Sequence, residues 1–177
     1  SAHYQTGVQK TKVLEISEVT TAALKAKESG ATRFCMGAAW REVKDGPDFD
    51  HVLKLVETVK SLGLETCCTL GMINDGQALR LKNAGLDFYN HNIDTSPEFY
   101  EKIIQTRTFK DRIKTLQTIR KTDIKVCTGG ILGMGESNED RMEFIRQLVN
   151  LDPKPESLTV NVLVKVPGTP LEQNPDL

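Results

Sequence analysis

The sequence predicts an α/β protein built on a parallel β-sheet, either a barrel of the TIM type or an open doubly wound sheet. Helix-like and strand-like segments alternate along the chain, a pattern that is typical of parallel sheets. Most of the strand-like segments also have one apolar and one polar face. A parallel sheet covered on both sides is apolar on both faces. The polar second face therefore favours a barrel wall whose interior holds a ligand or a metal.

The elements follow from local stop and start signals. Strands are predicted over residues 32–39, 65–70, 87–94, 125–132 and 158–165. Helices are predicted over residues 16–29, 50–62, 75–83, 97–105, 111–121 and 138–150. Ser17 is the expected N-cap of the first helix, and Pro97 is expected to begin the fourth helix. Gly30, Gly63 and Gly85 are expected to end the first, second and third helices. No linker interrupts the pattern, so residues 1–177 are expected to form a single domain.

Composition excludes several classes of partner. The chain has 177 residues, with 23 basic and 24 acidic side chains, which gives no reason to expect a nucleic acid or an anionic membrane as partner. No window approaches the ~18 apolar residues of a membrane span, and no signal or transit segment is visible. The four cysteines include no CxxC pair and are too scattered for a disulfide scaffold, which favours a reduced, intracellular setting.

Three of the cysteines share the predicted polar face. Alternation along the strands points Cys35, Cys67 and Cys127 inward, while Cys68 has the opposite parity and is expected to be structural. A free cysteine in a strand is usually a small buried hydrophobe, and that interpretation stays open for each of them. Together the three thiols could instead converge on a soft metal or an iron–sulfur cluster.

The strand ending at residues 90–94 carries a second polar group. Asn90, Asn92 and Asp94 share a face, and Thr95 or Ser96 is available to cap the helix that follows. Amides and a carboxylate in this pattern suit ribose hydroxyls and a small polar ligand.

Other features allow two interpretations. The glycine-rich run at 129–136 predicts either a tight turn or a backbone that approaches a flat ligand, and it matches neither GxGxxG nor a P-loop. His91 is expected to face outward in a structural role, and Arg112 has the spacing of a solvated helix charge.

Four segments resemble the biotin synthase family of radical S-adenosylmethionine (SAM) enzymes, and the resemblance runs along essentially the whole chain. They are TRFCMGAAW at 32–40, YNHNIDTSPEFY at 89–100, KVCTGGI at 125–131 and NVLVKVPGTPL at 161–171. The resemblance implies a TIM-type barrel and a sulfurtransferase that converts dethiobiotin to biotin, the last step of biotin synthesis. It also implies a homodimer, an electron donor such as a flavodoxin or ferredoxin, and a location in the cytoplasm, or in the mitochondrial matrix of a eukaryote.

The resemblance further implies two clusters. In that family a [4Fe-4S] cluster in a CxxxCxxC loop cleaves SAM to a 5′-deoxyadenosyl radical, which abstracts hydrogen from dethiobiotin. A [2Fe-2S] cluster, held by three cysteines and an arginine, supplies the sulfur. By motif match, the three cysteines are Cys35, Cys67 and Cys127.

Ligand contacts are carried over in the same way. Asn92 and Asp94 match residues at the SAM ribose, and Arg112 matches an arginine at its methionine carboxylate. Positions that line the methionyl and adenine groups are matched by Ala38, Ile131 and Val164. Positions near dethiobiotin are matched by Asn90, Asn92 and Asn161.

The chain also departs from the family pattern. It has no CxxxCxxC run, residues 1–4 resemble the segment just after that loop, and the arginine ligand is expected beyond Leu177. A partial barrel with open edges that is inactive alone is therefore expected. Two rival hypotheses remain. One is another radical SAM barrel enzyme that does not use three inward cysteines to hold a cluster. The other is a non-catalytic binding domain with a doubly wound sheet.

Overall fold

The computed structural model describes residues 12–177, so the expectation for residues 1–4 lies outside the described residues. Five parallel strands stand in the order β1-β2-β3-β4-β5. Their bounds are β1 Arg33–Gly37, β2 Glu65–Thr69, β3 Phe88–Asn90, β4 Lys125–Leu132 and β5 Ser157–Val162. The order in space is thus the order in sequence.

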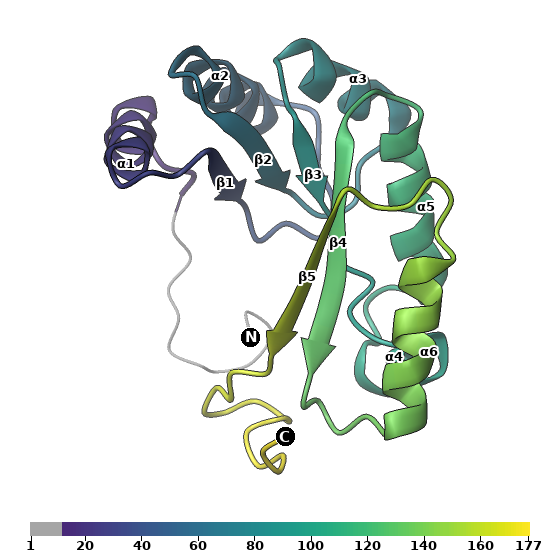
Figure 1. Ribbon diagram of the computed structural model, residues 1–177. Helices are drawn as coiled ribbons and strands as arrows, with labels where there is room; N and C mark the ends of the chain where they lie inside the picture. Colours follow the sequence, from purple (N-terminus) through teal and green to yellow (C-terminus); the bar gives the residue numbers. More distant parts are fainter. Residues whose placement is uncertain (1–11) are drawn as a thin grey trace.

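The helices of the described residues cover one side of this sheet, which curls into half a barrel (Figure 1). Their bounds are α1 Ile16–Glu28, α2 Pro47–Ser61, α3 Asp75–Asn83, α4 Pro97–Ile103, α5 Phe109–Arg120 and α6 Asn138–Val149. A doubly wound sheet has helices on both faces and a reversal in strand order. Neither occurs within residues 12–177, so the partial-barrel prediction is confirmed and the doubly wound alternative is wrong.

Strand parity explains which side the helices cover. The outward side chains Cys68, Tyr89 and Val126 are buried in one core with apolar residues of the helices. A second cluster joins Val19 of α1 to Val59 of α2, with Phe34 of β1 packed against it. Burial raises the pKa of the Cys68 thiol to about 12, which fits its predicted structural role.

Several predicted bounds are wrong for local reasons. The first helix begins after Glu15, whose backbone N–H donates to the Glu18 carboxylate, so Ser17 is not the N-cap. The second begins at Pro47 rather than residue 50, because Gly46 at φ 147° turns the chain into it. The third and fifth strands are shorter than predicted, and they end at Asn90 and Val162.

The glycine-rich run belongs partly to β4, whose bounds agree with the predicted strand, and partly to the loop that follows. Gly129 and Gly130 lie inside β4, where an added Cβ would stand 1.7 Å from the carbonyl oxygen of Thr159 and 2.2 Å from that of Asp94, respectively. These two glycines therefore allow neighbouring backbone of this chain to approach β4. The loop glycines proper are Gly133 and Gly135, both at positive φ.

Candidate functional site

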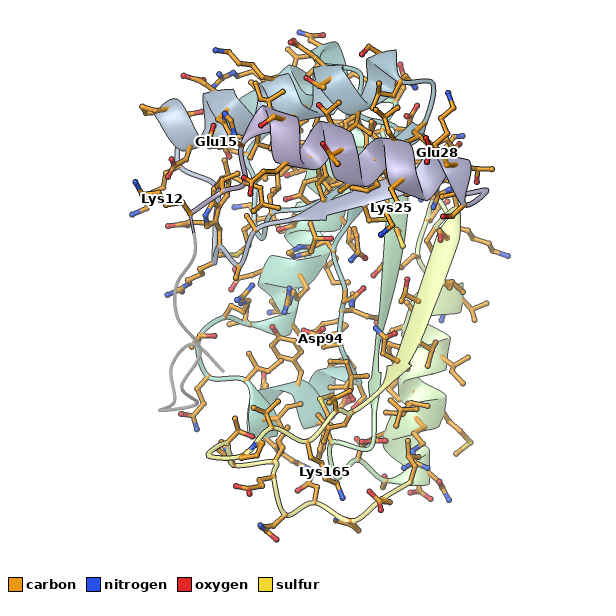
Figure 2. All side chains as sticks on the ribbon, turned by 90° about the vertical axis from the view of Figure 1, so that its left-hand side faces the viewer. Lys12, Glu15, Lys25, Glu28, Asp94 and Lys165 are labelled. Carbon is orange, nitrogen blue, oxygen red and sulfur yellow. The ribbon has the colours of Figure 1, made fainter. Side chains whose placement is uncertain are left out.

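The open side of the sheet carries the predicted site residues, and Figure 2 views the molecule from this side with Asp94 near the middle of the picture. Inward side chains alternate with the buried outward ones along each strand. The carboxyl ends of the parallel strands meet at one rim, where groups from different strands lie together. Two groups of side chains occupy this side, a cysteine group and a strand-end group.

The cysteine group comes from three strands. Cys35 and Cys67 are direct partners in the β1–β2 register. Cys67 and Cys127 are buried in one small cluster with Phe88 of the strand between them. The sulfur of Cys127 also lies 3.3 Å from the Thr159 hydroxyl. The fold thus brings the three predicted cysteines to one inward face, although they are separated by up to 92 residues in sequence (Cys35 to Cys127, 127 − 35).

The electrostatics of this group are asymmetric. A hydrogen bond from Cys67 lowers the pKa of Cys35 to about 6. Burial raises this pKa in part, and the Arg33 charge lowers it further. The same hydrogen bond, together with burial, raises the pKa of Cys67. The two shifts have opposite directions, so the thiolate form is favoured on Cys35 relative to Cys67.

Among residues 12–177, no three His, Cys, Asp or Glu side chains are close enough to hold one metal ion. The cysteines are arranged as a neighbouring pair plus a third thiol two strands away.

The strand-end group lies where β3 ends. The Asn90 side-chain N–H donates to the Thr69 hydroxyl at 3.1 Å. The Oδ1 atoms of Asn90 and Asn92 are buried, and neither has a hydrogen-bond partner among the described residues. Buried polar atoms are nearly always paired, so two orphaned acceptors at the end of β3 mark an unmet hydrogen-bonding capacity there. Ser96 caps α4 by accepting from Phe99 N–H at 3.1 Å, which confirms that Asp94 is not needed as the cap.

Asp94 is instead held by an arginine. Arg112 of α5 donates to its carboxylate at 2.5 Å and to the Tyr100 hydroxyl at 3.0 Å, and the side chains of the ion pair are each 13% exposed. Burial raises the pKa of Asp94, while the charges of Arg112 and Arg107 oppose the shift. Arg112 therefore packs against the strand-end group and is not the solvated charge that its helical spacing alone indicated. Asp94 also has φ 69°, a backbone strain that is typical of functional positions.

The remaining predicted positions surround these groups. Ala38 follows β1 and donates its N–H to the Thr69 carbonyl. Ile131 of β4 is the register partner of Asn161 of β5. Val164 lies beyond the end of β5 and is 79% exposed. His91 is buried on the outward side, as predicted, and burial with the nearby Arg112 and Arg107 charges lowers its pKa to about 3.

One inward residue was missed. Phe88 has the same parity as Asn90 and lies between two of the cysteines, yet an aromatic residue on a polar face gave no signal of a site. The available clue was its spacing of two residues from Asn90 and four from Asn92, which places all three on one face of the strand.

Comparison with known proteins identifies the family of this half-barrel. The sequence profile of the Radical SAM superfamily matches residues 3–148, so the chain belongs to that superfamily. Over 175 residues it is 58% identical to the biotin synthase of Sorangium cellulosum (strain So ce56), covering 99% of this chain and 50% of that protein. It is 57% identical over 177 residues to the biotin synthase of Rickettsia felis, covering 100% of this chain and 57% of that protein. The chain thus spans about half the length of the curated relatives it matches.

Solved structures agree with the fold. Methylornithine synthase superposes with a TM-score of 0.82 at 20% identity, covering 99% of this chain and 51% of that one. A maturase of the [FeFe]-hydrogenase superposes with a TM-score of 0.76 at 15% identity, covering 98% and 41%. Within residues 12–177, no helix has the length and apolar character needed to cross a bilayer.

Proposed function

We propose that the full-length protein containing this chain is a biotin synthase, which inserts sulfur into dethiobiotin by radical SAM chemistry. The observation that carries the proposal is the set of Cys35, Cys67 and Cys127 on one inward face, in a chain that is 55–60% identical to curated biotin synthases. A radical SAM relative with different chemistry has no need of all three thiols.

The residues fit a [2Fe-2S] cluster. Such a cluster takes two ligands on each of two irons, usually thiolates. The neighbouring pair Cys35 and Cys67 and the separate Cys127 suit a two-iron group better than a single ion. When bound, the cluster would supply the sulfur atom, and Cys35, Cys67 and Cys127 would hold it on the inward face of the sheet.

The strand-end group fits SAM and dethiobiotin. The orphaned acceptors of Asn90 and Asn92 are free to accept from N–H or O–H groups of a ligand. Asp94 would accept from the ribose hydroxyls, and Arg112 would pair with the methionine carboxylate. Ala38, Ile131 and Val164 would line the methionyl and adenine positions, and Asn161 would contact dethiobiotin.

The [4Fe-4S] cluster implied by the superfamily has no ligand set in this chain. None of the four cysteines lies in a CxxxCxxC run, so no residue here is assigned to it and no step is derived through it. A homodimer, an electron donor such as a flavodoxin or ferredoxin, and a cytoplasmic location belong to the same proposal for the full-length protein.

Removal of single thiols tests the proposal. In the full-length protein, Cys35→Ala, Cys67→Ala or Cys127→Ala should each abolish the visible absorbance of the [2Fe-2S] centre, because each removes one protein ligand. Cys68→Ala is the matched control, since its thiol is buried on the outward side and should leave the spectrum intact. Absorbance spectra with iron and sulfide analysis decide the matter. An intact spectrum in the Cys127 variant would contradict the assignment.

Asp94→Ala should weaken SAM binding by one to two decades without unfolding the protein. Loss of charge-assisted hydrogen bonds to two hydroxyls costs about 1.5–3 kcal/mol. Ser96→Ala is the control, because it removes the N-cap of the neighbouring helix α4 and leaves the Asp94 carboxylate in place. Equilibrium dialysis of both variants gives the comparison. If the two lose affinity equally, or if Asp94→Ala loses none, the role of Asp94 is confined to the helix entry and Arg112.

A further inference from the structure

Beneath the cysteine group lies a second layer of inward side chains, Arg33, Glu65, Phe88 and Lys125, here called the floor. The three charged members each lie two residues before one of the inward cysteines, so strand alternation places them on the same face. Phe88 connects them, because its register partners are Cys67 on one side and Lys125 on the other.

The contacts within the floor join two cations to one ring and one carboxylate. The guanidinium carbon of Arg33 lies 3.4 Å from the centre of the Phe88 ring, and the Lys125 ammonium lies 5.1 Å from it. Arg33 also donates two hydrogen bonds to Glu65, at 3.2 and 3.1 Å. Lys125 is 4.0 Å from the same carboxylate. Two positive charges and one negative charge leave the floor with a net charge of +1.

Phe88 contacts both the floor cations and two of the thiols. The ring is 4% exposed and packs in one cluster with Cys67 and Cys127, so apolar material fills the space under both sulfurs. A charge acts more strongly across such a medium than across water. The floor charges therefore reach the cysteine group through Phe88, whose ring contacts both cations and packs with two of the cysteines.

We propose that Arg33 is a positioning residue that sets the reduction potential of the [2Fe-2S] cluster. Lys125 acts in the same direction and Glu65 in the opposite one. The inference rests on the function proposed above. A one-electron reduction adds one negative charge to the cluster, with the electron taken from an external reductant and no bond of the chain made or broken. The positive floor stabilises the more negative, reduced cluster, and Glu65 moderates this effect.

Charge-changing variants test the inference in the full-length protein. Each is titrated anaerobically against potential while the visible absorbance of the [2Fe-2S] centre is followed. At the midpoint potential of the unsubstituted protein, Arg33→Gln should lower the ratio of reduced to oxidised cluster at least tenfold, a downward shift of about 59 mV for one electron. Lys125→Gln should lower it less, because its charge lies farther from the ring, and Glu65→Gln should raise it. Arg33→Lys should restore most of the loss, since it keeps the charge.

The chain offers a matched control. Arg80 lies 4.8 Å from the centre of the Phe49 ring and pairs with Asp45 and Asp50 on the outer helical layer. Arg80→Gln removes the same kind of contact outside the cluster of Cys67, Phe88 and Cys127 and should leave the potential unchanged.

Two results would overturn the inference. One is an unchanged potential in Arg33→Gln; the other is a shift of the same sign in Arg33→Gln and Glu65→Gln, which would indicate general disturbance in place of charge. If Arg33→Gln does not fold, the direction of the Glu65→Gln shift alone decides. Absence of [2Fe-2S] absorbance in the unsubstituted protein would refute the proposed function itself, and a normal absorbance with either overturning result would refute only this inference.

Discussion

Residues 1–177 produced alone should neither fold stably nor form 5′-deoxyadenosine or biotin. The outer face of β5 is uncovered: Leu158, Val160 and Val162 are 57%, 55% and 63% exposed. On α6, Met142, Ile145 and Val149 form an exposed apolar stripe at helical spacing. A contiguous apolar surface of this kind promotes aggregation unless another segment covers it.

The edges of the sheet add to this instability. Within residues 12–177, β1 and β5 each have a strand partner on one side only, and unpaired edges promote association between chains. The chemical argument is independent, because the chain has no CxxxCxxC run to hold the reducing cluster. Addition of that loop alone should restore neither stability nor catalysis, since the uncovered face would remain.

The measurement compares residues 1–177 with the full-length protein. Thermal melting and size-exclusion chromatography report stability and association. Anaerobic reconstitution with iron and sulfide, followed by assays for 5′-deoxyadenosine and biotin, reports catalysis. A cooperative melt with turnover near that of the full-length protein would contradict the prediction.

Gly129→Ala should be among the most destabilising single changes in the sheet. The added Cβ would stand 1.7 Å from the Thr159 carbonyl oxygen and 2.6 Å from its carbon, both of which are backbone atoms that cannot rotate away. Forced overpacking typically costs 1–3 kcal/mol, and about 3 kcal/mol or more is expected here because β4 and β5 must separate. Cys127 lies two residues earlier on the same face, so loss of the [2Fe-2S] absorbance should accompany the lower melting temperature.

Gly37→Ala is the control for this change. Gly37 also lies on an inward strand face, but an added Cβ would approach nothing closer than the Thr69 oxygen at 3.8 Å, an ordinary contact. Thermal melting and absorbance spectra of both full-length variants provide the test. Equal melting temperatures for the two would show that β5 can move away from β4 at little cost.

The sequence by itself determined the features that depend on neighbours a few residues apart. Alternation at i and i+2 separated the inward Cys67 from the outward Cys68, because successive strand side chains point to opposite faces. Local capping signals likewise indicated that Asp94 is not needed as the N-cap of α4, because Thr95 or Ser96 was available and Ser96 takes that place. The alternation of helices and strands was also readable, because its periodicity is local.

Features that depend on residues far apart in the chain became visible in the tertiary structure alone. The alternation of helices and strands is common to a barrel and a doubly wound sheet; the polar strand face favoured the barrel, and the strand order then excluded the doubly wound alternative within residues 12–177. The pairing of Arg112 with Asp94 joins residues 18 positions apart, and the Arg33–Glu65 contact joins residues 32 apart. Helical spacing cannot show which of several arginines forms a buried ion pair. Strand parity cannot show that Phe88 packs between two thiols. Such contacts arise only when the packing of the helices fixes how the strands lie beside one another.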